Sequence, residues 1–261
     1  MSPRVIKTSR RGLAFLPFSG WQKAALHLDI GRQQIALRDG KETQVVHLES
    51  PLRIGRSLVD DLPVLQQAIE PLLSKRGGSS RALDVSISDT LARHWILQRP
   101  EGLATPEELK ALAQHQLRSV FGDSVQDARE WAVQLDDQPF AQAWPGMALP
   151  KELIAMLVAA SEAHGFSLRS LQTRFVRAIN QKQSVLAEFL SLGKARLYAL
   201  ETADSVTIGI RQGAHWKALR SHPPLACLSV PLATLFQRDC LAAGLALEAC
   251  SVRFLEWPEA A

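Results

Sequence analysis

The most informative part of this chain is residues 26–38, which read Leu26-His-Leu-Asp-Ile-Gly31 and then Arg32-Gln-Gln-Ile-Ala-Leu-Arg38. Apolar and polar residues alternate from 26 to 30, which predicts a half-buried β-strand that ends at the glycine. A second strand follows, and Asp39-Gly40 is a strong hairpin signal before the apolar residues of 45–48. We therefore expect an antiparallel meander of three strands, with one acid, Asp29, at the tight turn between the first two.

After the meander, the spacing of the apolar residues alternates between the spacing typical of a helix and that typical of a strand, which predicts a mixture of both elements. Thr105-Pro-Glu-Glu108 is a capping box with proline at the first helical position, which predicts a helix from there to Gly122. The other elements expected before residue 179 are a helix from Leu58, strands over 82–87, 91–97, 130–135 and 140–149, a helix from Pro150 to Gly165, and a strand and connector over 167–178.

The last part of the chain repeats the opening theme. Strands are expected over 195–200, 206–210 and 216–219, then a helix from Pro231 to Gly244 and a closing strand over 247–254. Two regions thus each begin with a three-stranded meander followed by a helix and a strand. A duplicated βββαβ order, with mixed sheets in an α/β class, predicts the actin-like, ribonuclease H-like fold.

Composition agrees with a globular protein that carries a basic tail. The 261 residues are 46% hydrophobic, enough for one large domain or two small ones. The first eleven residues hold four basic side chains and no acid, and the remainder balances at 26 basic and 26 acidic residues. We expect no signal peptide, no membrane-spanning helix and no nucleic-acid partner. The predicted organisation is a tail over 1–20, a first lobe over 21–178 with an inserted subdomain at about 90–149, and a second, shortened lobe over 179–261.

No pattern in the sequence predicts a catalytic residue or a metal site. The three cysteines, Cys227, Cys240 and Cys250, lack CxxC spacing, so we expect buried thiols in a reducing cytoplasm. The P-loop, HExxH and GxSxG patterns are absent from the sequence.

Four short motifs resemble one family. They are Leu28-Asp-Ile-Gly31, the strand Leu83–Ile87 running into Leu91–Leu97, the capped helix at Thr105 with the later Trp131 strand and Pro139 turn, and Ser161-Glu-Ala-His-Gly165. Together they resemble PilM, the actin-like component of type IV pilus machines, as well as MshI-type proteins and the cytoplasmic domain of the type II secretion protein GspL. The resemblance covers most of residues 24–254.

The resemblance implies a place for a nucleotide and also departures from it. Asp29 and Gly31 match the first phosphate loop, where glycine lets backbone N–H groups approach phosphate. Arg32 departs from it, because the family prefers a small or hydroxyl residue there; its guanidinium would either bind phosphate or be a solvated hairpin arginine. At the second loop, Leu200-Glu-Thr-Ala-Asp-Ser205, the acid would survive as Glu201, but the glycine is gone. The family's Gly-Gly adenosine loop is missing too, since the only such pair is Gly77-Gly78. If ATP with Mg²⁺ binds, these four residues would hold it.

Two functions from different classes follow from the resemblance. The first is a cytoplasmic adaptor without a cofactor, peripheral to the inner membrane, that grips the cytoplasmic segment of a PilN-like membrane protein and contacts a pilus or secretion ATPase. The alternative is an ATPase or small-molecule kinase of the same fold. Whether the chain forms a homodimer is left open.

The partner peptide is expected to dock on the inserted subdomain. Its predicted strand 91–97 carries Arg93 and Trp95, residue types enriched at binding hot spots. The aromatic residues of the subdomain exceed what so small a unit is expected to bury, and exposed aromatic patches mark interfaces. We therefore expect Arg93, Trp95, Leu97 and Leu109 to contact the peptide. The other interpretation is that Trp95 belongs to the core.

Overall fold

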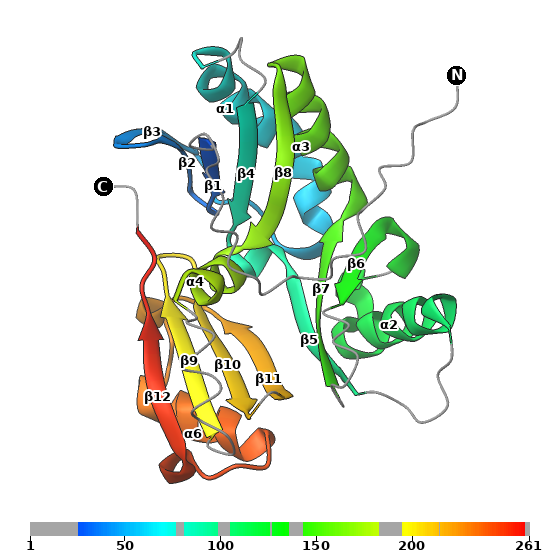
Figure 1. The fold of residues 1–261 in the computed structure, drawn as a ribbon, viewed down its shortest axis with the longest axis vertical. Coiled ribbons are helices and arrows are strands. Elements are labelled where there is room, and N and C mark those ends of the chain that lie inside the picture. The colour runs from blue at the N-terminus through cyan, green and yellow to red at the C-terminus, as the bar shows by residue number, and fades with distance from the viewer. Residues whose placement is uncertain are drawn as a thin grey trace.

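The computed structural model describes residues 26–76, 81–98, 105–125, 127–135, 143–182, 195–213 and 215–258. Within these ranges the strands form three sheets, one in each lobe and one in the inserted subdomain (Figure 1). The predicted basic tail of residues 1–20, the Gly77-Gly78 pair and the turn at 136–139 lie outside the described residues.

The first lobe is built on a sheet of five strands in the order β3-β2-β1-β4-β8. The predicted meander is confirmed, and Gly40 takes the positive φ of 61° that its hairpin turn needs. Strands β4 and β8 join parallel to β1. The strands are β1 (Leu26–Ile30), β2 (Gln34–Asp39), β3 (Glu42–His47), β4 (Arg81–Ile87) and β8 (Phe166–Thr173).

Two helices, α1 (Leu62–Ser74) and α3 (Lys151–Ala163), pack on each other and against this sheet. Buried residues of α1 recur at the three- and four-residue spacing of one helix face, so this face lies on the sheet. Helix α3 ends where predicted, with Gly165 at a φ of 76°. The core of the lobe includes Leu26, Leu28, Ile30, Leu65, Ile69, Leu83, Val85, Leu153 and Leu157.

The inserted subdomain has a sheet in the order β5-β7-β6 and one helix packed on it. The predicted capping box is confirmed, because Glu108 N donates to Thr105 Oγ1 at 3.2 Å and Thr105 N donates to Glu108 Oε2 at 3.0 Å. Gly122 ends the helix at a φ of 51°. The elements are β5 (Arg93–Gln98), α2 (Pro106–Phe121), β6 (Trp131–Leu135) and β7 (Ala143–Pro150).

The second lobe repeats the βββαβ order with a sheet in the order β11-β10-β9-β12. Its last strand lies parallel to β9, as β4 lies parallel to β1. The described part of this sheet has no strand in the place that β8 takes in the first sheet. The elements are β9 (Ala195–Glu201), β10 (Val206–Gln212), β11 (His215–His222), α6 (Leu232–Ala242) and β12 (Cys250–Leu255).

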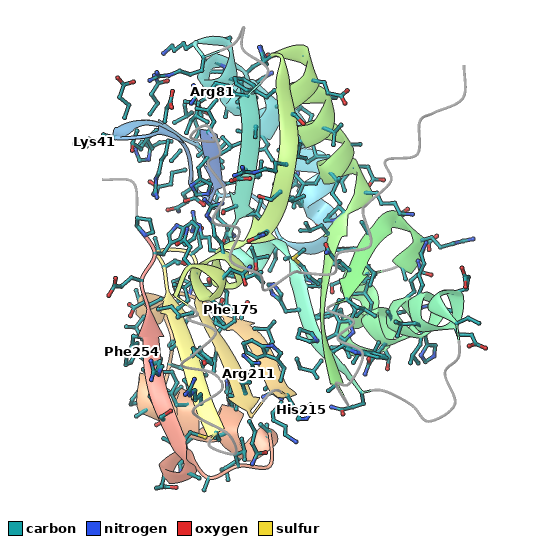
Figure 2. All side chains as sticks on the ribbon, in the orientation of Figure 1. Lys41, Arg81, Phe175, Arg211, His215 and Phe254 are labelled. Carbon is teal, nitrogen blue, oxygen red and sulfur yellow. The ribbon has the colours of Figure 1, made fainter. Side chains whose placement is uncertain are left out.

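The predicted connector after β8 is a helix, α4 (Arg174–Lys182), and the boundary expected at 178/179 falls inside it. Phe175 lies at its start, beside the second sheet (Figure 2). A Cβ on Gly209 of β10 would lie 2.5 Å from the Phe175 ring, so this glycine makes room for the contact. Helix α4 therefore joins the first sheet to the core of the second lobe.

Short 3-10 helices fill several connections, and two of them, η1 (Gly55–Asp61) and η2 (Asp89–Leu91), lie near the cleft between the lobes. The expectation of buried thiols holds for Cys240 but is wrong for Cys227, which is exposed. Among the described helices, none has the length and apolar character needed to cross a bilayer. The remaining 3-10 helices are η3 (Gly122–Val125), η4 (Ala128–Glu130), η5 (Leu225–Cys227) and η6 (Leu247–Ala249).

Candidate functional site

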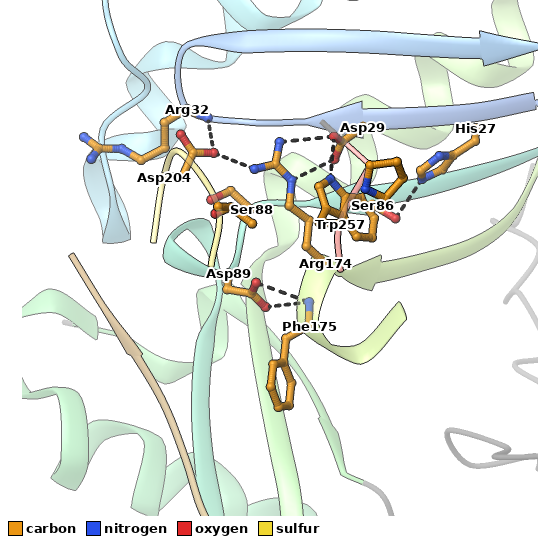
Figure 3. A network of polar contacts seen from close by, with 12 residues as sticks. His27, Asp29, Arg32, Ser86, Ser88, Asp89, Arg174, Phe175, Asp204 and Trp257 are labelled. Atoms are coloured by element: carbon orange, nitrogen blue, oxygen red, sulfur yellow. Dashed lines mark hydrogen bonds and ion pairs between the residues drawn. The ribbon is translucent and has the colours of Figure 1, made fainter. Parts of the chain in front are cut away.

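Two tight turns, one from each lobe, lie close together in the cleft (Figure 3). The turn after β1 is closed by Gly31 N donating to Gln34 O at 2.8 Å. The turn after β9 is closed in the same way, by Thr202 N donating to Ser205 O at 2.9 Å. The lobes thus present matching turns, as expected of a duplicated fold.

Arg174, the first residue of α4, joins the acids of the two turns. Its Nε and Nη2 donate to Asp29 Oδ1 and Oδ2 at 2.9 and 3.2 Å, and its Nη1 donates to Asp204 Oδ2 at 2.9 Å. The side chains of Arg174 and Asp29 are each 4% exposed and that of Asp204 is 9% exposed. Burial by itself would lower the pKa of Arg174, but Asp29 and then Asp204 raise it above its usual value.

Gly31 lies against this group at a distance that excludes a side chain. A Cβ there would be 2.7 Å from Arg174 Nη2 and 3.0 Å from Asp204 Oδ2. The next backbone group, Arg32 N, donates to Asp204 Oδ2 at 3.0 Å. The open side of the glycine turn therefore faces side chains of the protein itself.

Two further residues complete the buried polar network. Trp257, which follows β12, donates from Nε1 to Asp29 Oδ2 at 3.2 Å, and the Arg174 guanidinium lies 5.9 Å from its ring centroid. Asp89 of η2 accepts from Phe175 N at 3.2 Å. Burial raises the pKa of the Asp89 carboxyl to about 6, despite the hydrogen bonds it receives from Thr173 and Phe175.

The sequence identified part of this site. Asp29, Gly31 and Arg32 all belong to it, and Arg32 Nε also donates to Leu52 O at 3.0 Å. The expectation for the second turn is wrong, because Glu201 ends β9 with an exposed side chain and the acid in the cleft is Asp204. Arg174 and Trp257 were missed as well, since neither lies in a motif and both reach Asp29 only through the fold.

A magnesium nucleotide held by these turns, as the resemblance implies, does not fit the residues that are present. The backbone N–H after Gly31 already donates to a carboxylate, and the space beside the glycine holds the Arg174 guanidinium. The two acids that would face a cation are joined by that guanidinium instead. In the described ranges no three His, Cys, Asp or Glu side chains gather in a way that could hold a metal ion.

A cavity of about 230 Å³ opens at the turns, where Arg32 and Asp204 line it together with residues of η2, the inserted subdomain and the end of β11. Arg93 of β5 lines it, and its guanidinium lies 5.5 Å from the ring centroid of Phe121. Among the described residues no acid pairs with Arg93 and its buried Nε has no acceptor, while burial lowers its pKa. His94 also lines the cavity, and its buried Nδ1 lacks a hydrogen-bond partner in the described structure.

The other residues expected to bind a partner do not form an exposed surface. Trp95 is 4% exposed and Leu97 is 1% exposed, and both belong to the core between β5 and α2. A Cβ on Gly146 would lie 2.6 Å from the Trp95 ring, so β7 is shaped around this tryptophan. Leu109 is partly buried against the same core. The expectation of unburied aromatic residues is wrong, because the subdomain encloses Trp95, Trp131 and Trp144.

The sequence and the structure of this chain were compared with those of known proteins. No family model matches the sequence, and no curated protein is similar to it in sequence. The PilM-PilN type IV pilus biogenesis complex matches with a TM-score of 0.52 and 16% identity over 87% of this chain and 68% of that chain.

Two weaker structural matches fall below a TM-score of 0.5. The cytoplasmic domain of EpsL, an inner membrane component of the type II secretion system of Vibrio cholerae, gives 0.45 and 10% identity over 76% of this chain and 70% of that chain. A protein of unknown function from Bacteroides thetaiotaomicron with an actin-like ATPase fold gives 0.42 and 12% identity over 77% and 70%. The two meanders, their matching turns and the likeness to the PilM structure give one conclusion: this chain has the actin-like ATPase fold.

Proposed function

We propose that this protein is a cytoplasmic adaptor of a type IV pilus or related type II secretion machine. It lies at the inner membrane and binds the cytoplasmic segment of a PilN-like membrane protein, with a pilus or secretion ATPase as a second partner. The likeness to PilM, whose solved structure is a complex with PilN, supports this assignment.

One observation carries the proposal. The turns of the two lobes are joined by Arg174 and Asp204, whereas Arg93, which lines the same cavity as Asp204, pairs with no acid among the described residues. A guanidinium that has no acid partner can form charge-assisted hydrogen bonds with acceptors of a partner segment. The geometry thus favours binding of a peptide over binding of ATP.

The cavity also fits what a peptide requires. The Phe121 ring and the exposed Ile54 give apolar contact, while Arg93 brings a positive charge to the same cavity. Arginine is one of the residue types enriched at the hot spots of protein interfaces, and Arg93 is half-buried beside the Phe121 ring. We propose that Arg93 donates to a backbone carbonyl or side-chain acceptor of the partner segment.

The test is titration calorimetry with a synthetic peptide of the cytoplasmic N-terminal segment of the PilN-like protein from the same organism. The wild-type chain should bind it, and Arg93→Ala should bind about tenfold more weakly or worse. Arg129→Ala is the matched control, because Arg129 also belongs to the inserted subdomain but its side chain is 86% exposed and paired with Asp127. Equal affinity of both variants, or no binding by the wild type, contradicts the proposal.

The alternative, an ATPase or kinase of the same fold, requires a phosphate loop with free N–H groups. Arg32 N is bonded to Asp204 at 3.0 Å, and a Cβ at Gly31 would already be too close to Arg174. These contacts favour the adaptor.

A further inference from the structure

We infer that the protein's own side chains occupy the cleft in place of a magnesium nucleotide. Arg174 takes the role of the Mg²⁺ cation, and Asp204 takes the role of a phosphate group. The actin-like fold leads one to expect a bound metal nucleotide between the lobes, and the residues disagree with that expectation. The inference concerns how the lobes are held together and does not depend on which partner the protein binds.

The carboxylate of Asp204 takes the role of a phosphate group. In a phosphate loop, glycine allows a backbone N–H to donate to a phosphate oxygen. Here the glycine is Gly31, the N–H is that of Arg32, and the acceptor is Asp204 Oδ2 at 3.0 Å, which comes from the other lobe. A carboxylate of the second lobe thus satisfies a donor of the first.

The guanidinium of Arg174 takes the role of the cation and lies between the acids of the two turns (Figure 3). A guanidinium presents several donors in one plane and can bind a carboxylate with two of them, as Arg174 does with Asp29. Its remaining Nη1 reaches Asp204. One side chain therefore binds an acid of each lobe at their point of contact.

The network crosses between the lobes at more than one point. Asp29 also accepts from Trp257 of the second lobe at 3.2 Å, and the rings of His27 and Trp257 lie with their centroids 6.0 Å apart. These groups are nearly all excluded from water, where charge-assisted hydrogen bonds are least screened. We conclude that the chain holds its own lobes in one closed arrangement, without help from a nucleotide.

The test compares Arg174→Ala with the wild type by hydrogen exchange of the two turns, residues 29–34 and 202–206. Exchange there should rise by at least about tenfold in the variant, because the clamp between the lobes is lost. Millimolar methylguanidinium should restore much of the protection, since it can occupy the space that the substitution leaves. Arg169→Ala is the control, because its ion pair with Asp84 lies within the first sheet.

Asp204→Asn, which keeps the side-chain shape, provides a second variant if Arg174→Ala does not fold. Hydrogen exchange in the same two turns should rise, because the neutral amide of asparagine accepts hydrogen bonds from Arg174 and Arg32 N more weakly than a carboxylate does. Unchanged exchange in the turns of either folded variant overturns the inference. Micromolar binding of Mg-ATP to the wild type that is lost in Arg174→Ala also overturns it, because Arg174 would then be a nucleotide ligand. None of these readouts involves the partner peptide, so they are separate from the test of the adaptor.

Discussion

Arg174 and Asp29 form a two-pronged ion pair across 145 residues of sequence, with Nε to Oδ1 at 2.9 Å and Nη2 to Oδ2 at 3.2 Å. Both side chains are 4% exposed. A buried ion pair of this kind need not add net stability, but removing one member leaves an uncompensated charge. Breaking this pair should therefore lower the stability of the protein and also change the contacts in the cleft.

Asp29→Asn is expected to lower the free energy of unfolding by about 3–5 kcal/mol, the range for breaking a buried pair from one side. Chemical denaturation measures the change. Asp61→Asn is the control, because Asp61 pairs with Arg53, whose side chain is 53% exposed, and such surface pairs contribute about 1 kcal/mol or less. A loss at Asp29 no larger than at Asp61 would show that Arg174 is not strongly bound to it.

Gly31→Ala should destabilise the protein by about 1–3 kcal/mol, the usual cost of forcing extra volume into a packed site. The reason is the 2.7 Å approach of the new Cβ to Arg174 Nη2. The same substitution in an Arg174→Ala background should cost less, because one of the clashing atoms is gone. Strict additivity of the two changes in thermal denaturation would argue against contact between these residues.

Trp95→Ala should destabilise the inserted subdomain by about 3–5 kcal/mol, because it empties a core position that is 4% exposed. Arg93→Ala, two residues away, should change stability far less while it weakens peptide binding. Denaturation and calorimetry on the same samples separate the two roles. A Trp95→Ala protein with wild-type stability would mean that this side chain is not part of the core.

The stability of the protein should fall on acidification, partly through His94. Burial, together with Arg93, lowers the pKa of His94 to about 4 from 6.5, so below pH 6.5 the unfolded chain binds a proton that the folded chain does not. Through His94 the free energy of unfolding should fall by about 1.4 kcal/mol per pH unit, or about 2 kcal/mol between pH 6.5 and 5. Asp89 acts in the opposite direction, because its pKa of about 6 favours the folded state at low pH.

Denaturation midpoints of His94→Gln at pH 7 and pH 5 isolate the histidine from these other groups. The variant should lose less stability over this range than the wild type, whereas His115→Gln, an exposed residue of α2, should follow the wild type. Parallel curves for wild type and His94→Gln would contradict the assignment of His94 as a buried neutral imidazole.

The elements predicted well from sequence are those specified by local chemistry. The Asp39-Gly40 hairpin, the capping box at Thr105 and the helix ends at Gly122 and Gly165 each depend on residues within a few positions of one another. The alternating apolar residues of 26–30 likewise specified the first strand. The order of these elements was enough to predict the actin-like fold.

The site was predicted only where it lies in a motif. Asp29 and Gly31 belong to one turn, but Asp204 and Arg174 reach them from other parts of the chain, and no local pattern records such contacts. The sequence places Glu201 at the matching turn, yet β9 runs through that position and leaves its side chain exposed. Composition does not reveal how much aromatic surface three short strands and a helix can bury together, so it does not predict that Trp95 lies in their core.

The decisive experiment is calorimetric titration of the PilN-like peptide into the wild-type chain, with and without Mg-ATP. We expect the peptide to bind with the same affinity in both conditions and Mg-ATP alone to give no heat of binding. Binding of Mg-ATP that tightens the peptide complex by about tenfold, a coupling of about 1.4 kcal/mol, would contradict it.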